Sequence, residues 1–176
     1  MFSNQIFKGK VVLITGGRSG IGYSMAESYL QHGATVYICA RKEELLLEAT
    51  TRLSTHGSVF AKKCDIRLPE DIESLINYIK SNNHTIDILI NNAGGQFIAP
   101  AEDITVNGWN AVVNNNLNGT WYMSQLISKA FFIPQKMGII INIIINIYKG
   151  FPGMAHSAAA RAGVDNLTKT LAIEWS

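Results

Sequence analysis

Cysteine is scarce in this chain of 176 residues. Only Cys39 and Cys64 are present, which is too few for a disulfide framework. Both lie near the ends of apolar segments, so we expect two buried thiols in a reducing compartment.

Charge of one sign and long apolar runs are also lacking. The formal net charge is only +2, which gives no reason to expect nucleic acid or an anionic membrane as a partner. The longest apolar stretch, 138–147, is interrupted by two asparagines and is far shorter than the roughly 20 residues that span a bilayer. Near the amino terminus only four apolar residues, 11–14, follow two lysines, which is too short for a secretory signal. We therefore expect a cytoplasmic protein, and a peroxisomal one only if a targeting signal lies beyond residue 176.

Short apolar segments alternate with longer amphipathic ones along the whole chain. The expected strands are 11–15, 35–39, 59–64, 86–90 and 139–145, and the expected helices are 20–32, 43–55, 69–81, about 109–130 and 158–174. Buried strands separated by helices of ten or more residues are typical of a parallel sheet that is covered on both faces. The sequence thus predicts an α/β fold of the doubly wound, Rossmann type, forming one domain over residues 1–176.

The order of these segments ends with a helix that no strand follows. Sheets of this type normally continue, so we expect a truncated chain that lacks its final strands and part of the substrate pocket.

A glycine cluster follows the first strand. The segment Thr15-Gly16-Gly17-Arg18-Ser19-Gly20-Ile21-Gly22 lies between a strand and a helix. Glycines there permit a tight turn and a close approach of the backbone to a pyrophosphate, which the helix N-terminus can bind. A plain turn is the alternative, but the strand–loop–helix order favours a dinucleotide site.

With further motifs, the cluster resembles the short-chain dehydrogenase/reductase family. Asp65 follows the third strand, Asn91-Asn92-Ala93-Gly94 follows the fourth, and Asn116 lies in the long helix, as in that family. The resemblance implies a nicotinamide cofactor, with Asp65 near the adenine and Asn116 as a structural and proton-relay residue. It assigns cofactor binding to Thr15, Gly16, Arg18, Ser19, Gly20, Ile21, Gly22, Arg41, Lys42, Asp65, Asn92, Ala93, Gly94 and Arg161.

The end of the second strand bears on which nicotinamide cofactor binds. An acidic residue there would accept hydrogen bonds from the ribose 2′-hydroxyl and would repel a 2′-phosphate. This chain instead has Ala40, Arg41 and Lys42, and Arg18 lies in the glycine loop. A guanidinium can bind a phosphate in bidentate fashion, so we expect NADPH. Solvated surface charges are the alternative.

The usual catalytic residues of the family are absent. Ser157 stands where a tyrosine is expected, Arg161 where a lysine is expected, and Ile144 or Ile145 where a serine is expected. Three hypotheses remain: a non-catalytic protein that only binds cofactor, an alcohol or carbonyl oxidoreductase, and a reductase that needs no alkoxide partner.

The third hypothesis is supported by a narrower resemblance. Gly94-Gly95-Gln96-Phe97, and Gly150-Phe151-Pro152 with His156-Ser157, are similar to the trans-2-enoyl-CoA reductase branch of the family, the peroxisomal type. That branch saturates the 2,3 double bond of acyl-CoA thioesters with NADPH, so it implies an acyl-CoA substrate. The related 2,4-dienoyl-CoA reductases also carry serine in place of the tyrosine. The family further implies a homodimer or homotetramer, and we expect no metal.

The proton donor of such a reaction is open. Tyr148 is our candidate because it follows the fifth strand at the carboxyl edge of the sheet, although it could only pack on Phe151. His156 is another candidate, but could be a helix cap. The tyrosine that the human-type enoyl-CoA reductase carries on its last helix is Asp165 here. Ser157 and Arg161, one helical turn apart, are expected to donate a hydrogen bond and to hold ribose and charge.

Overall fold

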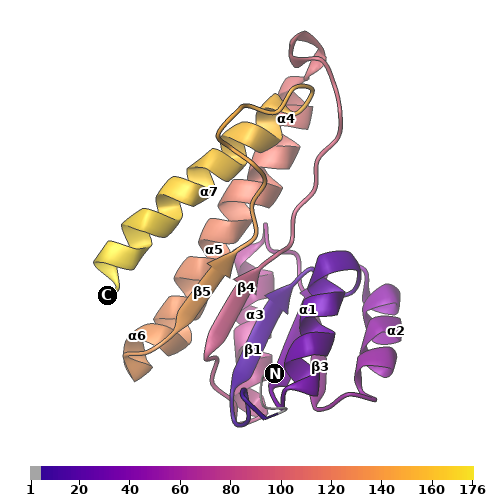
Figure 1. The fold of residues 1–176 in the computed structure, drawn as a ribbon, viewed down its shortest axis with the longest axis vertical. Coiled ribbons are helices and arrows are strands. Elements are labelled where there is room, and N and C mark those ends of the chain that lie inside the picture. Colours follow the sequence, from indigo (N-terminus) through magenta and orange to yellow (C-terminus); the bar gives the residue numbers. More distant parts are fainter. Residues whose placement is uncertain (1–4) are drawn as a thin grey trace.

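A twisted parallel sheet of five strands forms the centre of the computed structural model, which describes residues 5–176. The strand order is β3-β2-β1-β4-β5, with all neighbours parallel (Figure 1). The bounds are β1 (Val11–Thr15), β2 (Thr35–Ala40), β3 (Val59–Lys63), β4 (Ile88–Asn91) and β5 (Ile139–Asn142). The predicted doubly wound class is therefore confirmed.

Burial of the strands follows their place in the sheet. β1, β2 and β4 have a neighbour on each side, and every residue of β1 and β4 is buried. Such strands are continuous apolar runs because helices cover both of their faces. β5 lies at one edge of the described sheet, and Ile139 and Ile141 on it are exposed.

Helices cover the two faces through two separate cores. On one face α1 (Gly20–Gln31) and α2 (Glu43–Leu53) pack on the sheet, with Ala26 and Leu46 among the buried residues. On the other face α3 (Pro69–Ser81) and α5 (Gly119–Ile127) do so, contributing residues such as Leu75. Proline in the first turn of α3, followed by two acidic residues, favours the start of that helix.

The long helix begins earlier than expected and is not uniform. It starts at α4 (Val106–Val113), because the Thr105 hydroxyl accepts a hydrogen bond from the Gly108 N–H at 3.0 Å and caps it. Two π-helical turns, Asn114–Asn118 and Ser128–Phe132, flank α5 before the short α6 (Ile133–Gln135). The predicted start at about residue 109 was therefore three residues too late.

The end of β5 and the start of α7 each differ from the prediction by three residues. β5 ends at Asn142 instead of residue 145, because its partner β4 ends at Asn91, the residue opposite Asn142. The last helix, α7 (Ala155–Glu174), begins before residue 158 and runs beside α4 and α5 (Figure 1). This places Ser157 within the first turn of α7. Within residues 5–176, no helix is both long and apolar enough to cross a membrane.

Candidate cofactor and active site

A cleft opens at the carboxyl ends of the strands, where the chain order of the sheet reverses between β1 and β4. Ligands bind at this switch point in open α/β sheets. The cleft encloses about 530 Å³, a volume in the range of small-molecule sites. Its walls are formed by Gly16, Arg18, Ser19, Cys39, Ala40, Arg41, Lys42, Cys64, Asp65, Ile66, Asn92, Ala93, Gly94 and Asn115.

The glycine loop fits closely against the loop after β4. Gly16 adopts a positive φ of 69°, which favours glycine, and a Cβ there would lie 3.1 Å from the Ala93 Cα. A Cβ on Gly22 would lie 2.5 Å from the Asn92 amide nitrogen and 2.6 Å from the Gly16 carbonyl oxygen. Both positions therefore exclude a side chain, as the predicted cradle for a dinucleotide requires.

Thr15 joins the two loops that line the cleft. Its buried hydroxyl accepts hydrogen bonds from the backbone N–H groups of Asn92, at 3.0 Å, and Ala93, at 2.9 Å. The Asn92 amide in turn donates to the Thr15 carbonyl at 3.0 Å. Thr15 was predicted to bind cofactor, but it is not itself part of the cleft wall. Its hydrogen bonds instead hold the two wall-forming loops in position.

The N-cap of α1 lies on the cleft wall, whereas the predicted cofactor residues Gly20, Ile21 and Gly22 are not part of the wall. Ser19 is the N-cap residue, and its side chain makes no capping hydrogen bond within residues 5–176. The first N–H groups of a helix have no partner within the helix, and together with the helix dipole they attract phosphate. Arg18 adds a positive charge at the same mouth, next to Gly20 and the exposed Ile21.

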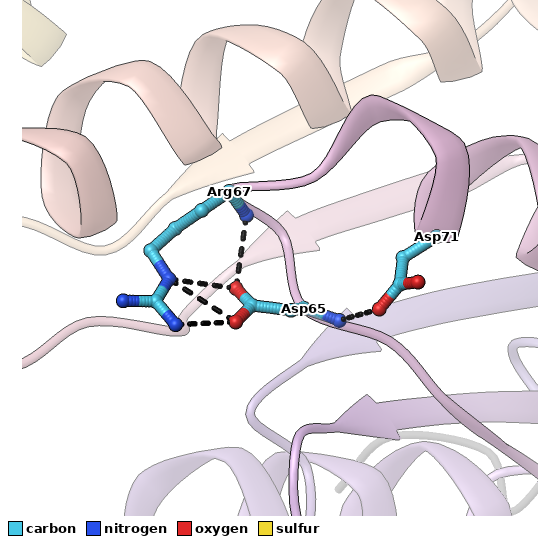
Figure 2. Close-up of polar contacts among 3 residues, drawn as sticks. All are labelled: Asp65, Arg67 and Asp71. Atoms are coloured by element: carbon cyan, nitrogen blue, oxygen red, sulfur yellow. Dashed lines mark hydrogen bonds and ion pairs between the residues drawn. The ribbon is translucent and has the colours of Figure 1, made fainter.

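Three charged side chains define the far end of the cleft. Arg41 and Lys42 are exposed on the wall after β2, and Asp65 lies on the wall after β3. The Asp65 carboxylate is paired with Arg67, whose Nε donates to Oδ1 at 2.9 Å (Figure 2). This pairing, more than any other contact, lowers the pKa of Asp65. Sequence reasoning missed Arg67, because an acid and a base two residues apart in a loop are not distinctive.

Asn116 holds the loop after β4 in place. It is fully buried in the first π-helical turn, and π-turns often occur at functional sites. Its amide nitrogen donates to the carbonyls of Gly95, at 2.7 Å, and Val112, at 2.9 Å, and its Oδ1 accepts from the Gly95 N–H at 3.2 Å. These bonds position the glycine-rich loop, and a part in proton transfer stays a prediction.

Arg161 is buried beside this loop without an acidic partner among the described residues. The side chain is 6% exposed, and its Nη1 has no hydrogen-bond partner in residues 5–176. Burial lowers the pKa of its guanidinium. The group packs so closely on Gly94 that a side chain there would collide with it. A buried, unpaired cation carries a large desolvation cost, so the site is suited to a ligand that brings negative charge.

Ser157 and His156 lie next to Arg161 in the first turn of α7. The Ser157 hydroxyl lies 3.4 Å from Oε1 of Gln96, and its backbone N–H donates to Nδ1 of His156 at 2.8 Å. In a neutral ring the proton of His156 is therefore on Nε2, which is buried and has no partner in the described part of the chain. The ring of Phe97 packs edge-to-face on His156 at 4.5 Å. Residues of the 95–97 loop and of α7 thus form one cluster.

The structure does not bring Tyr148 into this cluster. Its side chain is 90% exposed on the loop between β5 and α7, near enough to Lys169 to help to raise the pKa of that lysine, after the larger effect of Asp165. Lys169 lies about two helical turns beyond Arg161. Asp165 is engaged with Lys169 in an ion pair. The role predicted for Tyr148 as proton donor remains a prediction.

Curated relatives include enzymes that act on acyl-CoA thioesters. The chain is 40% identical over 168 residues to the probable 2,4-dienoyl-CoA reductase of Bacillus subtilis, covering 94% of this chain and 66% of that protein. It is 33% identical to the peroxisomal 2,4-dienoyl-CoA reductase of Mus musculus, covering 99% of this chain and 61% of that protein. The chain thus spans less than two thirds of the length of these relatives.

Solved structures agree with the fold. A short chain dehydrogenase from Bacillus anthracis is 48% identical, with a TM-score of 0.90 over 94% of this chain and 70% of that one. The citronellol catabolism dehydrogenase of Pseudomonas aeruginosa is 35% identical, with a TM-score of 0.94 over 99% of this chain and 72% of that one. The short chain dehydrogenase family profile matches residues 10–176. The chain therefore belongs to the short chain dehydrogenase family of oxidoreductases.

Proposed function

We propose that this chain is the cofactor-binding and catalytic part of an NADPH-dependent reductase of acyl-CoA thioesters with a conjugated double bond. The buried Arg161, which has no acidic partner in the described residues, carries the proposal. The 2,4-dienoyl-CoA reductases among the relatives favour a dienoyl-CoA, and the trans-2-enoyl-CoA of the sequence hypothesis is the second substrate to test.

Family membership implies a nicotinamide dinucleotide, and the cleft fits one. Gly16 and Gly22 allow the glycine loop to pack closely, because a Cβ at either position would come too near neighbouring atoms. The N-terminus of α1, with its unpaired N–H groups, lies at the cleft wall. When bound, the reduced nicotinamide would supply the hydride. Arg41 and Lys42 would hold the 2′-phosphate of NADPH, since the cleft wall at the end of β2 is formed by Ala40, Arg41 and Lys42 and has no acidic residue there to take the 2′-hydroxyl of NADH.

The charge at Arg41 leads to a direct prediction. Arg41→Ala removes a guanidinium able to bind phosphate with two hydrogen bonds, so the affinity for NADPH should fall about 10- to 100-fold while that for NADH stays nearly constant. Titration calorimetry with both nucleotides measures the effect. Lys129→Ala, which removes an exposed charge from the second π-helical turn, is the matched control. An unchanged NADPH affinity in Arg41→Ala would contradict this assignment.

The residues around Arg161 suit reduction of a conjugated thioester. Negative charge builds on the thioester oxygen in such a reaction and must be stabilised by donors placed in advance. The guanidinium of Arg161 remains protonated and provides fixed positive charge, and Ser157 can donate a hydrogen bond. Neither side chain is a good proton acceptor for an alcohol, because arginine holds its proton and the serine hydroxyl is very weakly acidic.

An alcohol oxidoreductase is the second candidate, since the citronellol catabolism dehydrogenase is 35% identical to this chain. The purified chain should therefore be assayed for NADPH oxidation with hexadienoyl-CoA and crotonyl-CoA, and for NADP⁺ reduction with citronellol. We expect turnover with the dienoyl thioester and none with the alcohol. Turnover of the alcohol alone would favour the second candidate. Tight NADPH binding without any turnover would leave the remaining hypothesis, a non-catalytic protein that only binds cofactor.

A further inference from the structure

We propose that Arg67 is a positioning residue that sets the preference for NADPH by neutralising Asp65 at the nucleoside end of the cleft. The inference rests on the proposed function, because it concerns the same nucleotide. Arg67 itself does not form part of the cleft wall, whereas Asp65 does. Arg67 is therefore placed to act on the nucleotide through the charge and orientation of Asp65.

Arg67 holds the carboxylate of Asp65, and Asp71 holds the Asp65 backbone. Arg67 donates from Nε to Oδ1 at 2.9 Å and to Oδ2 at 3.1 Å, from Nη2 to Oδ2 at 2.5 Å, and from its backbone N–H to Oδ1 at 3.1 Å (Figure 2). The Asp65 backbone is fixed as well, because its N–H donates to Oδ2 of Asp71 at 2.7 Å. The side chain therefore has one orientation, set by a planar fork that lysine could not reproduce.

A count of acceptor sites shows what remains for a ligand. A carboxylate offers about four lone-pair positions. Arg67 makes four hydrogen bonds to this carboxylate, two to Oδ1 and two to Oδ2, so all four positions are occupied. The Asp65 carboxylate is therefore fully engaged by Arg67, and we expect the pair to act on a bound nucleotide through its charge.

The charge of the pair matters more than its geometry for selectivity. Arg41 lies close enough to Asp65 to contribute to lowering its pKa, after the larger effect of Arg67. The two opposite charges therefore lie within range of electrostatic attraction. An unpaired carboxylate would oppose the positive charge of Arg41 and Lys42 and repel a 2′-phosphate bound by them. Because Arg67 cancels the charge of Asp65, the excess positive charge of this wall is left for the phosphate.

A double-mutant cycle tests this mechanism. Dissociation constants for NADPH and NADH are measured for the wild-type chain, Arg67→Leu, Asp65→Asn and the double variant. Arg67→Leu leaves Asp65 unpaired, so it should weaken NADPH binding about tenfold and NADH binding less than about twofold. The double variant carries neither charge, so its preference for NADPH over NADH should return to within about threefold of wild type.

Arg52→Leu, which removes an exposed arginine at the end of α2, is the control for the loss of a cation elsewhere. Equal weakening of both nucleotides by Arg67→Leu would show a merely structural role and overturn the inference. An unchanged preference, or no recovery in the double variant, would overturn it as well. If the inference fails in one of these ways but the wild-type chain still prefers NADPH over NADH, the proposed function stands. A wild-type chain that does not prefer NADPH would overturn both.

Discussion

Gly22→Ala should reduce the affinity for NADPH at least about 100-fold. The new methyl group would lie 2.5 Å from the Asn92 amide nitrogen and 2.6 Å from the Gly16 carbonyl oxygen, and neither atom can move freely. Gly16 lies in the turn that must approach the pyrophosphate, and Asn92 donates to the Thr15 carbonyl. Relief of the clash therefore displaces the glycine loop. Overpacking of this kind also costs about 1–3 kcal/mol of stability.

Fluorescence titration with NADPH and thermal unfolding measure the two effects separately. Ser24→Ala changes an exposed residue on the same helix, α1, and should leave both unchanged. If Gly22→Ala bound NADPH like the wild-type chain, the glycine loop could not be the site of the pyrophosphate.

Arg161→Met should lower kcat about 100- to 1,000-fold, as the loss of one donor to a developing oxyanion does in other enzymes. Methionine is apolar and of similar length, so it removes the charge without leaving a large cavity. Because Arg161 is 6% exposed and has no acidic partner in residues 5–176, its charge costs folding energy. The variant should therefore unfold at the same temperature as the wild-type chain, or at a higher one.

A lower kcat together with an unchanged or higher unfolding temperature would show that the charge of Arg161 serves activity and not stability. Steady-state kinetics with a dienoyl-CoA substrate and calorimetric unfolding supply the two readouts, and NADPH binding is the control for cofactor loss. Arg161→Lys retains a cation but not the planar fork, so its kcat should lie between that of the wild-type chain and that of Arg161→Met. A full loss of stability in Arg161→Met with kcat preserved in the folded fraction would contradict a catalytic role.

Two of the three departures from the usual catalytic residues, Ser157 and Arg161, lie on the same helix, whereas Ile144 and Ile145 lie in the loop after β5. Ser157, His156 and Arg161 share the first two turns of α7, and they meet the loop 95–97 and Asn116 across the end of the sheet. Replacement of a tyrosine and a lysine by a serine and an arginine thus changes one connected site. This concentration favours altered chemistry over a general decay of the fold.

The class of the fold could be predicted from the sequence, since it depends on local patterns. The apolar runs of β1 and β2 and the glycine turn between β1 and α1 are each readable within a dozen residues. Capping marks the ends of elements less visibly, so the start of α4 after Thr105 was missed. The end of β5 was missed for another reason, because a strand ends where its partner ends, and Asn142 lies opposite Asn91, the last residue of β4.

The make-up of the site divides between local sequence and long-range packing. The strand–glycine–helix start, the positive charge after β2 and the absence of the usual tyrosine and lysine follow from the sequence, because each depends on residues close together in the chain. The exposure of Tyr148 and the burial of Arg161 without a partner in the described residues depend on how the loops after β4 and β5 meet α7. Burial and partners set the charge and orientation of a side chain, and both arise from packing between distant segments.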